Sequence, residues 1–206
     1  MVAAALIIGA CSAPKQDPVK TQPSYDVLLA RAKRGDRDLD YQALRYAFTT
    51  TPAYDPYYGG LNALKQAMNK AYRAQDCAAA TRNAAEVLAV DYVEIDAHLV
   101  DDICFRQLGD TASAELHRMT ALGLLRSILQ SGDGKSPDNA YVVIAVAEEY
   151  SLLGTLGLKV TKQSLISKDN HAYDRMDVRG AEGTADAVFF NVDRPLSWMQ
   201  DHLKKD

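Results

Sequence analysis

The chain has 206 residues, a formal net charge of −4 and three cysteines. A chain of this length can bury a substantial core in one domain or in two fused halves. Acidic and basic residues are interspersed without a basic stripe, which argues against a nucleic-acid-binding surface. We therefore expect no nucleic acid among the partners of this protein.

The N-terminal segment ends in a lipobox-like sequence. An apolar run from Val2 to Ala10 closes with Ile8-Gly9-Ala10-Cys11, the pattern at which a bacterial export peptidase cuts before a cysteine that becomes lipid-modified. We predict that residues 1–10 are a lipoprotein signal peptide and that Cys11 is the lipidation site. The run lacks Lys and Arg and is shorter than usual. Either translation begins upstream of Met1, or the run is an apolar tail on a cytosolic protein.

A tether is predicted at residues 11–24. Three prolines lie among Ser, Lys, Gln and Thr without an apolar period, so this stretch cannot bury enough surface to order itself. The residue after Cys11 is Ser12, where Asp is the usual signal for retention in the inner membrane. The expected location is therefore the outer membrane facing the periplasm, with the N-terminal lipid as the membrane contact.

The middle of the chain carries an internal repeat. Gln75-Asp76 and Gly109-Asp110 lie 34 residues apart, and at the same offset Ala80 matches Ala114. This is the period of tetratricopeptide repeats, whose small residues let paired helices approach closely. The pattern predicts degenerate tetratricopeptide-like hairpins, with a generic pair of helical hairpins as the alternative. The expected helices are residues 61–74, 77–90, 95–108 and 111–130.

Two cysteines remain beyond Cys11. In an antiparallel pair of helices, Cys77 and Cys104 are nearly equidistant from the connecting turn near Tyr92, so they should face each other. An exported protein meets an oxidising compartment, and a disulfide needs an even number of cysteines. We predict a Cys77–Cys104 disulfide, with two separate buried thiols as the alternative.

Past residue 130 the pattern changes from helix to strand. A Gly- and Pro-containing segment ends the long helix, and a β-branched run follows at residues 141–146. A short helix at 148–157 precedes three alternating segments, 158–166, 171–178 and 185–192, which predict an antiparallel meander. Pro195 opens a last helix. The predicted fold class is α+β, with a helical region at 25–130 and a C-terminal region at 131–206 packed on it.

Six short motifs occur in an order that resembles a known family. They are Leu44-Arg45-Tyr46-Ala47-Phe48, Tyr54-Asp55-Pro56-Tyr57, Asp96-Ala97-His98, Ser131-Gly132-Asp133-Gly134-Lys135-Ser136, Glu148-Glu149-Tyr150 and Tyr173-Asp174. Together they resemble the domain of unknown function 4919 family of bacterial lipoproteins, over about residues 25–192. The resemblance supports the predicted fold and export. It implies no activity, because the family has none established.

A tyrosine cluster is the strongest candidate for partner binding. Tyr46, Tyr54, Tyr57 and Tyr58 lie close together in the sequence, and the last two precede a Gly-Gly turn. Tyrosine combines a large contact area with a polar tip, so recognition surfaces use it often. We expect some of these rings to be displayed to a protein or peptide partner. The alternative is that they pack the N-terminal segment onto the repeats.

An alternative site consists of Ser131, Asp133 and Lys135 together with Glu149 and Asp174. A hydrolase or a small-ligand-binding protein would need a pocket that brings these side chains together. The Gly134-Lys135-Ser136 sequence lacks the earlier glycine of a phosphate-binding loop and follows a helix instead of a strand. For Glu148 and Glu149, adjacent on a helix, we expect one to pair with a cation and the other to cap or solvate the helix.

Metal binding has weaker support. The side chains of Asp96, His98, Asp101 and His117 could approach one another across the second hairpin, but a polar helix face explains them as well. A calcium cage around Asp133 would place Lys135 among its ligands. We expect no cofactor and no metal. The predicted function is therefore an envelope lipoprotein that acts as an interaction module without enzymatic activity, with an envelope hydrolase or small-ligand-binding protein as the alternative.

Overall fold

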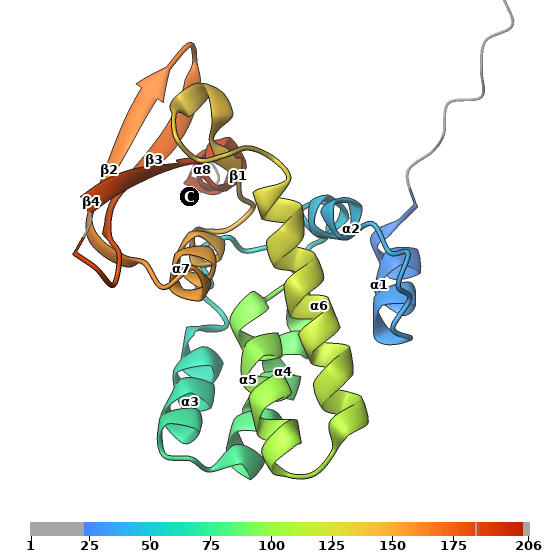
Figure 1. The fold of residues 1–206 in the computed structure, drawn as a ribbon. Helices are drawn as coiled ribbons and strands as arrows, with labels where there is room; N and C mark the ends of the chain where they lie inside the picture. The colour runs from blue at the N-terminus through green and yellow to red at the C-terminus, as the bar shows by residue number, and fades with distance from the viewer. Residues whose placement is uncertain (1–22, 184, 204–206) are drawn as a thin grey trace, which may run out of the picture.

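The computed structural model describes residues 23–183 and 185–203 (Figure 1). The predicted signal peptide, Cys11 and most of the predicted tether lie outside the described residues. Within them, the protein has an α+β fold, as predicted. Helices fill the N-terminal part. The sheet follows, with one short helix after its first strand and another after its last strand.

Six α-helices form the N-terminal part of the structure. They are α1 (Tyr25–Lys33), α2 (Tyr41–Phe48), α3 (Asn62–Arg73), α4 (Cys77–Val90), α5 (Ile95–Gln107) and α6 (Thr111–Leu129). The four helices that were predicted from the repeat are confirmed to within a residue at each end. Successive helices from α3 to α6 pack against each other as hairpins (Figure 1).

The repeated dipeptides form the same turn twice. Gln75 and Gly109 both adopt a left-handed backbone, with φ of +61° and +85°. The aspartates that follow them, Asp76 and Asp110, then accept hydrogen bonds from the amides of Ala79 and Ser113. An aspartate at this position satisfies an amide that has no partner within the helix, and this explains why α4 and α6 begin where they do.

The sheet is larger than predicted and is mixed. Its strands are β1 (Tyr141–Val142), β2 (Lys159–Lys168), β3 (His171–Arg179) and β4 (Ala185–Asn191), in the order β1-β4-β3-β2. The predicted meander β2-β3-β4 is confirmed. The predicted 141–146 strand is wrong in length. Only Tyr141 and Val142 pair in parallel with β4, and the Val143 and Ile144 side chains that follow are buried in the core.

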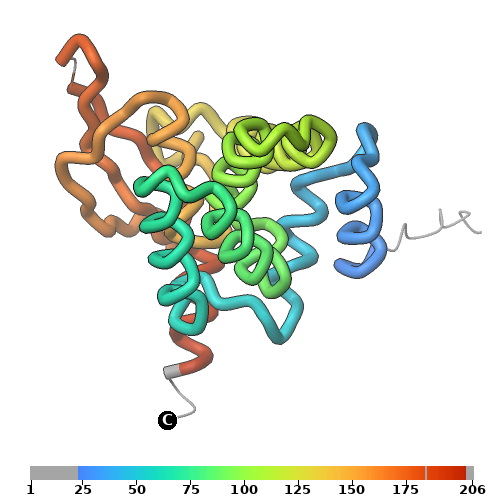
Figure 2. The backbone as a smooth tube through the Cα atoms, turned by 90° about the horizontal axis from the view of Figure 1, so that it is seen from below, coloured from blue at the N-terminus to red at the C-terminus, as the bar shows by residue number. Residues whose placement is uncertain are grey.

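Two further helices and one short turn complete the C-terminal part. They are the 3₁₀ turn η1 (Pro137–Asn139), α7 (Val146–Thr155) and α8 (Asp193–Leu203). Helix α7 lies between the sheet and the helical hairpins in Figure 1 and contacts both α5 and β2. In Figure 2 the end of α8 reaches away from the body of the molecule.

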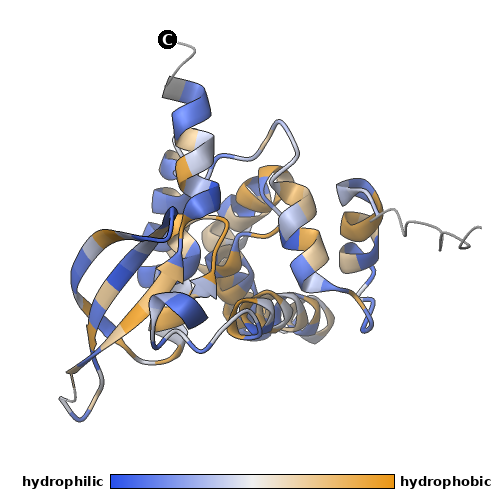
Figure 3. Ribbon diagram, turned by 90° about the horizontal axis from the view of Figure 1, so that it is seen from above, coloured by the Kyte–Doolittle hydropathy of each residue, from blue (hydrophilic) through white to orange (hydrophobic). Residues whose placement is uncertain are grey.

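A single apolar cluster joins the two parts of the chain. It includes Leu44 of α2, Leu124 of α6, Leu152 of α7 and Phe190 of β4, each at most 1% exposed. Figure 3 shows apolar residues, in orange, on helices and strands where these elements face each other. Burial of this surface is the main favourable term in folding, so the helical and sheet parts are expected to unfold together.

Candidate functional site

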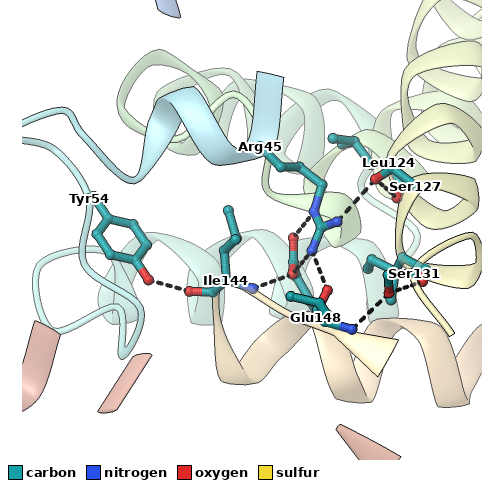
Figure 4. Close-up of polar contacts among 9 residues, drawn as sticks. Arg45, Tyr54, Leu124, Ser127, Ser131, Ile144 and Glu148 are labelled. Atoms are coloured by element: carbon teal, nitrogen blue, oxygen red, sulfur yellow. Dashed lines mark hydrogen bonds and ion pairs between the residues drawn. The ribbon is translucent and has the colours of Figure 1, made fainter. Parts of the chain in front are cut away.

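A buried ion pair joins the helical part to the sheet (Figure 4). The Arg45 guanidinium of α2 donates to both carboxylate oxygens of Glu148 on α7, with N–O distances of 2.7 and 2.6 Å. The same guanidinium donates to the Ser127 hydroxyl and to the Val142 carbonyl. The Glu148 carboxylate also accepts the Ile144 amide. The guanidinium and the carboxylate therefore both have several hydrogen-bond partners in the protein interior.

The expectation for the adjacent glutamates is half right. Glu148 pairs with a cation, as predicted. Glu149 neither caps the helix nor meets water, because it is fully buried and neither carboxyl oxygen has a hydrogen-bond partner. An ionised carboxylate is strongly disfavoured in such a position. Glu149 is therefore the chemically unusual member of the pair.

Glu149 lies in the field of a second carboxyl group. Burial first, and then the charge of Asp174 on β3, raise the pKa of Glu149 to about 9. Asp174 is also buried, and this raises its own pKa, while the Gln163 side-chain amide donates to it at 2.5 Å. The Tyr150 hydroxyl in turn donates to the side-chain oxygen of Gln163. At neutral pH Glu149 is thus a neutral acid that could give up a proton.

The 131–136 loop is not bonded to Glu149 or Asp174 in the described structure. The Ser131 hydroxyl donates to the Ile128 carbonyl and accepts the Val142 amide, which fixes the end of α6 to β1. Asp133 accepts the Lys135 amide within the loop. Among the described residues, no hydrogen bond or ion pair connects this loop to Glu149 or Asp174, so the structure supports a turn that anchors the sheet.

Two tyrosines of the predicted binding cluster belong to the interior. Tyr54 is 7% exposed, and its hydroxyl donates to the Ile144 carbonyl at 2.5 Å (Figure 4). Tyr58 is 8% exposed, and the Lys65 ammonium lies 3.8 Å from its ring centroid. These two rings follow the alternative expectation, because they pack the segment between α2 and α3 onto the core.

Lys65 also belongs to a buried acidic group. Its ammonium pairs with Glu94 at 2.6 Å, and Glu94 caps α5 by accepting the Ala97 amide. Burial and the nearby Glu94 charge raise the pKa of Asp91 to about 8. Asp91 also accepts the Val93 amide, so it orders the turn between α4 and α5. These contacts order the turn before α5.

The other two tyrosines lie on one surface with two residues of α8. Tyr57 is 37% exposed, and its ring centroid is 6.1 Å from that of Trp198. The Arg194 guanidinium lies 4.1 Å from the ring centroid of half-buried Tyr46. Because Arg194 and Trp198 are one helical turn apart, Tyr46 and Tyr57 lie against the same side of α8. We call Tyr46, Tyr57, Arg194 and Trp198 the aromatic face.

Sequence reasoning missed half of the aromatic face. Arg194 and Trp198 lie far from the tyrosines in sequence, and nothing in the local pattern of α8 connects the two segments. The buried Tyr54 ring makes the connection, since it packs edge-on against Trp198 at 6.5 Å. The available signal was the i, i+4 spacing of Arg194 and Trp198, in the one segment of the sequence that contains a tryptophan.

A histidine pair forms on the second hairpin, as the sequence allowed. The Nδ1 atoms of His98 and His117 are 2.9 Å apart, and the Nε2 of His98 is 2.9 Å from the Tyr92 carbonyl. Burial lowers the pKa of His98 to about 3 and raises that of Asp101 to about 7. Asp96 faces elsewhere and accepts the Ser151 hydroxyl. No group of three or more potential ligands suited to a metal ion occurs among the described residues.

The predicted disulfide is present. Cys77 at the start of α4 is bonded to Cys104 near the end of α5, with the two Cα atoms 4.9 Å apart. No helix of the described residues is long and apolar enough to cross a membrane. The disulfide fastens the central hairpin, at a distance from the aromatic face.

Comparison with known proteins gives one match. No curated protein and no solved structure matches the chain. The model of one family, described as "Domain of unknown function (DUF4919)", matches residues 17–201. This span includes the Arg45–Glu148 pair, the disulfide and the aromatic face. The chain therefore belongs to the DUF4919 family.

Proposed function

We propose that this protein is a bacterial envelope lipoprotein whose folded domain binds a protein or peptide partner through the aromatic face. The exposed Tyr57 ring beside Trp198 carries this proposal. Tyr, Trp and Arg are the residues that dominate the energetics of protein interfaces, especially where they cluster. The aromatic face consists of these three residue types alone.

The surroundings make the aromatic face suitable for binding. Tyr54 packs edge-on against the partly buried Trp198 and is fixed by its own hydrogen bond, so the exposed Tyr57 ring and its Trp198 neighbour rest on an ordered base. The Arg45–Glu148 pair lies one residue from Tyr46 and holds α2 against the sheet part. A surface that is ordered before binding loses less entropy when the partner docks.

The helical hairpins are the second part of the proposal. We interpret α3 to α6 as degenerate tetratricopeptide-like hairpins, a scaffold type that commonly binds peptides. The repeated turns at Gln75 and Gly109 support this interpretation. In this arrangement the C-terminal part closes one end of a stack that would be too short to stand alone.

The location is proposed from the N-terminal sequence. Acylation of Cys11 would place the domain on the outer membrane, facing the periplasm, and the disulfide is compatible with such an oxidising compartment. Incorporation of a palmitate analogue into the wild-type protein, and its loss in Cys11→Ser, would support the anchor. Equal labelling of the two proteins would overturn it.

The interaction is tested by affinity capture from the envelope. The wild-type protein should retain a defined partner, and Tyr57→Ala and Trp198→Ala should each reduce its recovery at least tenfold, the effect of a contact worth about 1.4 kcal/mol or more. Leu165→Ala changes another exposed residue, 59% exposed on β2, and is the matched control. Recovery that is unchanged in both aromatic variants would contradict the proposal.

A second candidate function follows from Glu149. A buried neutral carboxyl beside Asp174 resembles the acid of an acid–base pair, and this favours a hydrolase or a small-ligand-binding protein. Tyr57 lies in the field of both acids. Tight binding or turnover of a small ligand that Glu149→Gln abolishes, with folding intact, would support this candidate over the interaction module.

A further inference from the structure

A groove lies between the α1–α2 turn and α6. Two adjoining cavities, of about 720 and 560 Å³, share Arg37, Met119 and Arg126 in their walls. Gly35, at φ +70°, lets the turn approach α6 so closely that a Cβ atom there would lie 3.5 Å from the side chains of Leu116 and Met119. The groove is therefore built by a specific packing of the turn on the helix.

Four cations line this groove. They are Lys33, Arg34, Arg37 and Arg126, and all four are exposed. No salt bridge or side-chain hydrogen bond involves any of them within the part of the chain that the structure describes. Such a concentration of positive charge is notable in a chain whose net charge is −4.

The acidic groups of the groove are already engaged. The Asp40 carboxylate caps α2 by accepting the Ala43 amide. Glu115, which lies in the wall of the larger cavity with the four cations, pairs with Arg118 at 3.5 Å. Asp36, which neighbours the turn, pairs with Arg31 at 2.7 Å. None of these carboxylates forms an ion pair with the four cations in the described part of the chain, so the cations are available to pair with an anionic ligand.

The floor of the groove is apolar. Leu39, Leu116 and Met119 contribute apolar side chains. A cationic rim above such a floor suits a ligand with a negatively charged head and an adjoining apolar part.

We propose that this groove binds the phosphodiester headgroup of an anionic phospholipid at the membrane to which the protein is anchored. The proposal rests on the proposed lipid anchor, because the predicted tether ends at Ser24 and α1 begins at Tyr25. Over nine residues, α1 covers about 13 Å, so Lys33 and the groove lie close to the end of the tether. Basic residues at a membrane surface bind anionic lipids additively.

The test uses the full chain with Cys11→Ser, so that acylation cannot cause binding. Vesicles of phosphatidylcholine with about 30 mol % phosphatidylglycerol should bind this protein more tightly than phosphatidylcholine alone, and added salt should weaken the binding. The triple variant Arg34→Gln/Arg37→Gln/Arg126→Gln should bind the anionic vesicles about 100-fold more weakly, at about fivefold per cation. Circular dichroism should show that the variant folds.

A matched control removes the same charge elsewhere. Arg73→Gln/Arg82→Gln/Lys162→Gln changes three exposed cations outside the groove and should keep at least half of the wild-type affinity. Equal losses in both triple variants, or no loss in either, would overturn the groove assignment. Saturable binding of glycerol phosphate in the absence of vesicles, together with equal binding of the protein to neutral and anionic vesicles, would show that a soluble phosphate is the ligand and would overturn the membrane assignment. Palmitate labelling of Cys11 reports on the anchor independently of all these outcomes.

Discussion

Arg45 and Glu148 form a two-point ion pair across the boundary between the helices and the sheet, with both side chains nearly or fully inaccessible to solvent. The two residues are 103 positions apart in sequence. Arg45 also donates to the Ser127 hydroxyl of α6 and to the Val142 carbonyl of β1, and Glu148 accepts the Ile144 amide. The pair therefore fixes how α2, α6, α7 and β1 meet, and the aromatic face depends on that arrangement.

Removing one member of this pair should be costly. Arg45→Met leaves the Glu148 carboxylate buried without its cation, and we expect a loss of about 3–5 kcal/mol in the free energy of unfolding. The double variant Arg45→Met/Glu148→Leu leaves no lone charge and should recover most of that loss. Urea denaturation of the wild type, the single variant and the double variant measures the loss and its recovery. A cost below about 1 kcal/mol for the single variant would show that the pair is not the junction described above.

Glu149 should make stability depend on pH. Its pKa is about 9 in the folded protein against a model value of 4.5, so between these values the folded state holds more protons than the unfolded state. Stability then falls as pH rises through this window, by at most about 1.4 kcal/mol per pH unit for one group. The pKa of Asp91 is likewise raised, to about 8, so Asp91 also lowers stability as pH rises.

Glu149→Gln isolates this contribution. The variant cannot ionise at this position, so its stability should fall less steeply than that of the wild-type protein between about pH 6.5 and 9. Thermal unfolding across this pH range measures the slopes. Glu86→Gln changes an exposed carboxylate on α4 and should leave the slope unchanged. Parallel curves for wild type and Glu149→Gln would refute the description of Glu149 as a buried neutral acid.

The disulfide should contribute substantially to stability. It closes a loop between residues 27 positions apart, which on the chain-entropy model stabilises the fold by about 3–4 kcal/mol. Cys77→Ala/Cys104→Ala should lose about this amount in urea denaturation. Reduction by dithiothreitol should destabilise the wild-type protein and leave the double variant unaffected. If mass spectrometry under non-reducing conditions finds two free thiols, the bond is absent and the prediction fails.

Gly123 should be intolerant of a side chain. A Cβ at this position of α6 would overlap the ring of Tyr41 on α2. Gly123→Ala should therefore cost about 1–3 kcal/mol through displacement of α2. Gly154 in α7 has open space around the position of its Cβ, so Gly154→Ala should gain about 0.5–1 kcal/mol from helix propensity. Equal effects of the two substitutions would contradict the close packing of α2 on α6.

The local parts of the fold could be predicted from sequence. Asp76 and Asp110 mark helix starts by a short-range hydrogen bond, so the repeated dipeptide was sufficient to place α4 and α6. The disulfide followed from the geometry of one antiparallel hairpin. These features depend on residues that are close in sequence or joined by a single turn.

The long-range parts could not be predicted in this way. Arg45 lies in a helix whose pattern does not distinguish a solvated cation from a buried one, and only the position of Glu148 decides between them. Tyr54 and Tyr57 are similar in sequence context, yet one donates to a core carbonyl and the other is exposed. The aromatic face likewise depends on the docking of α8 beside Tyr54.

Site-specific photocrosslinking in the envelope tests the proposed interaction most directly. With p-benzoylphenylalanine in place of Tyr57, we expect a defined crosslinked product that contains the partner and that Trp198→Ala reduces. With the same probe at Val90, which is 44% exposed at the end of α4, we expect no such product. No product from position 57, or the same products from both positions, would contradict binding through the aromatic face.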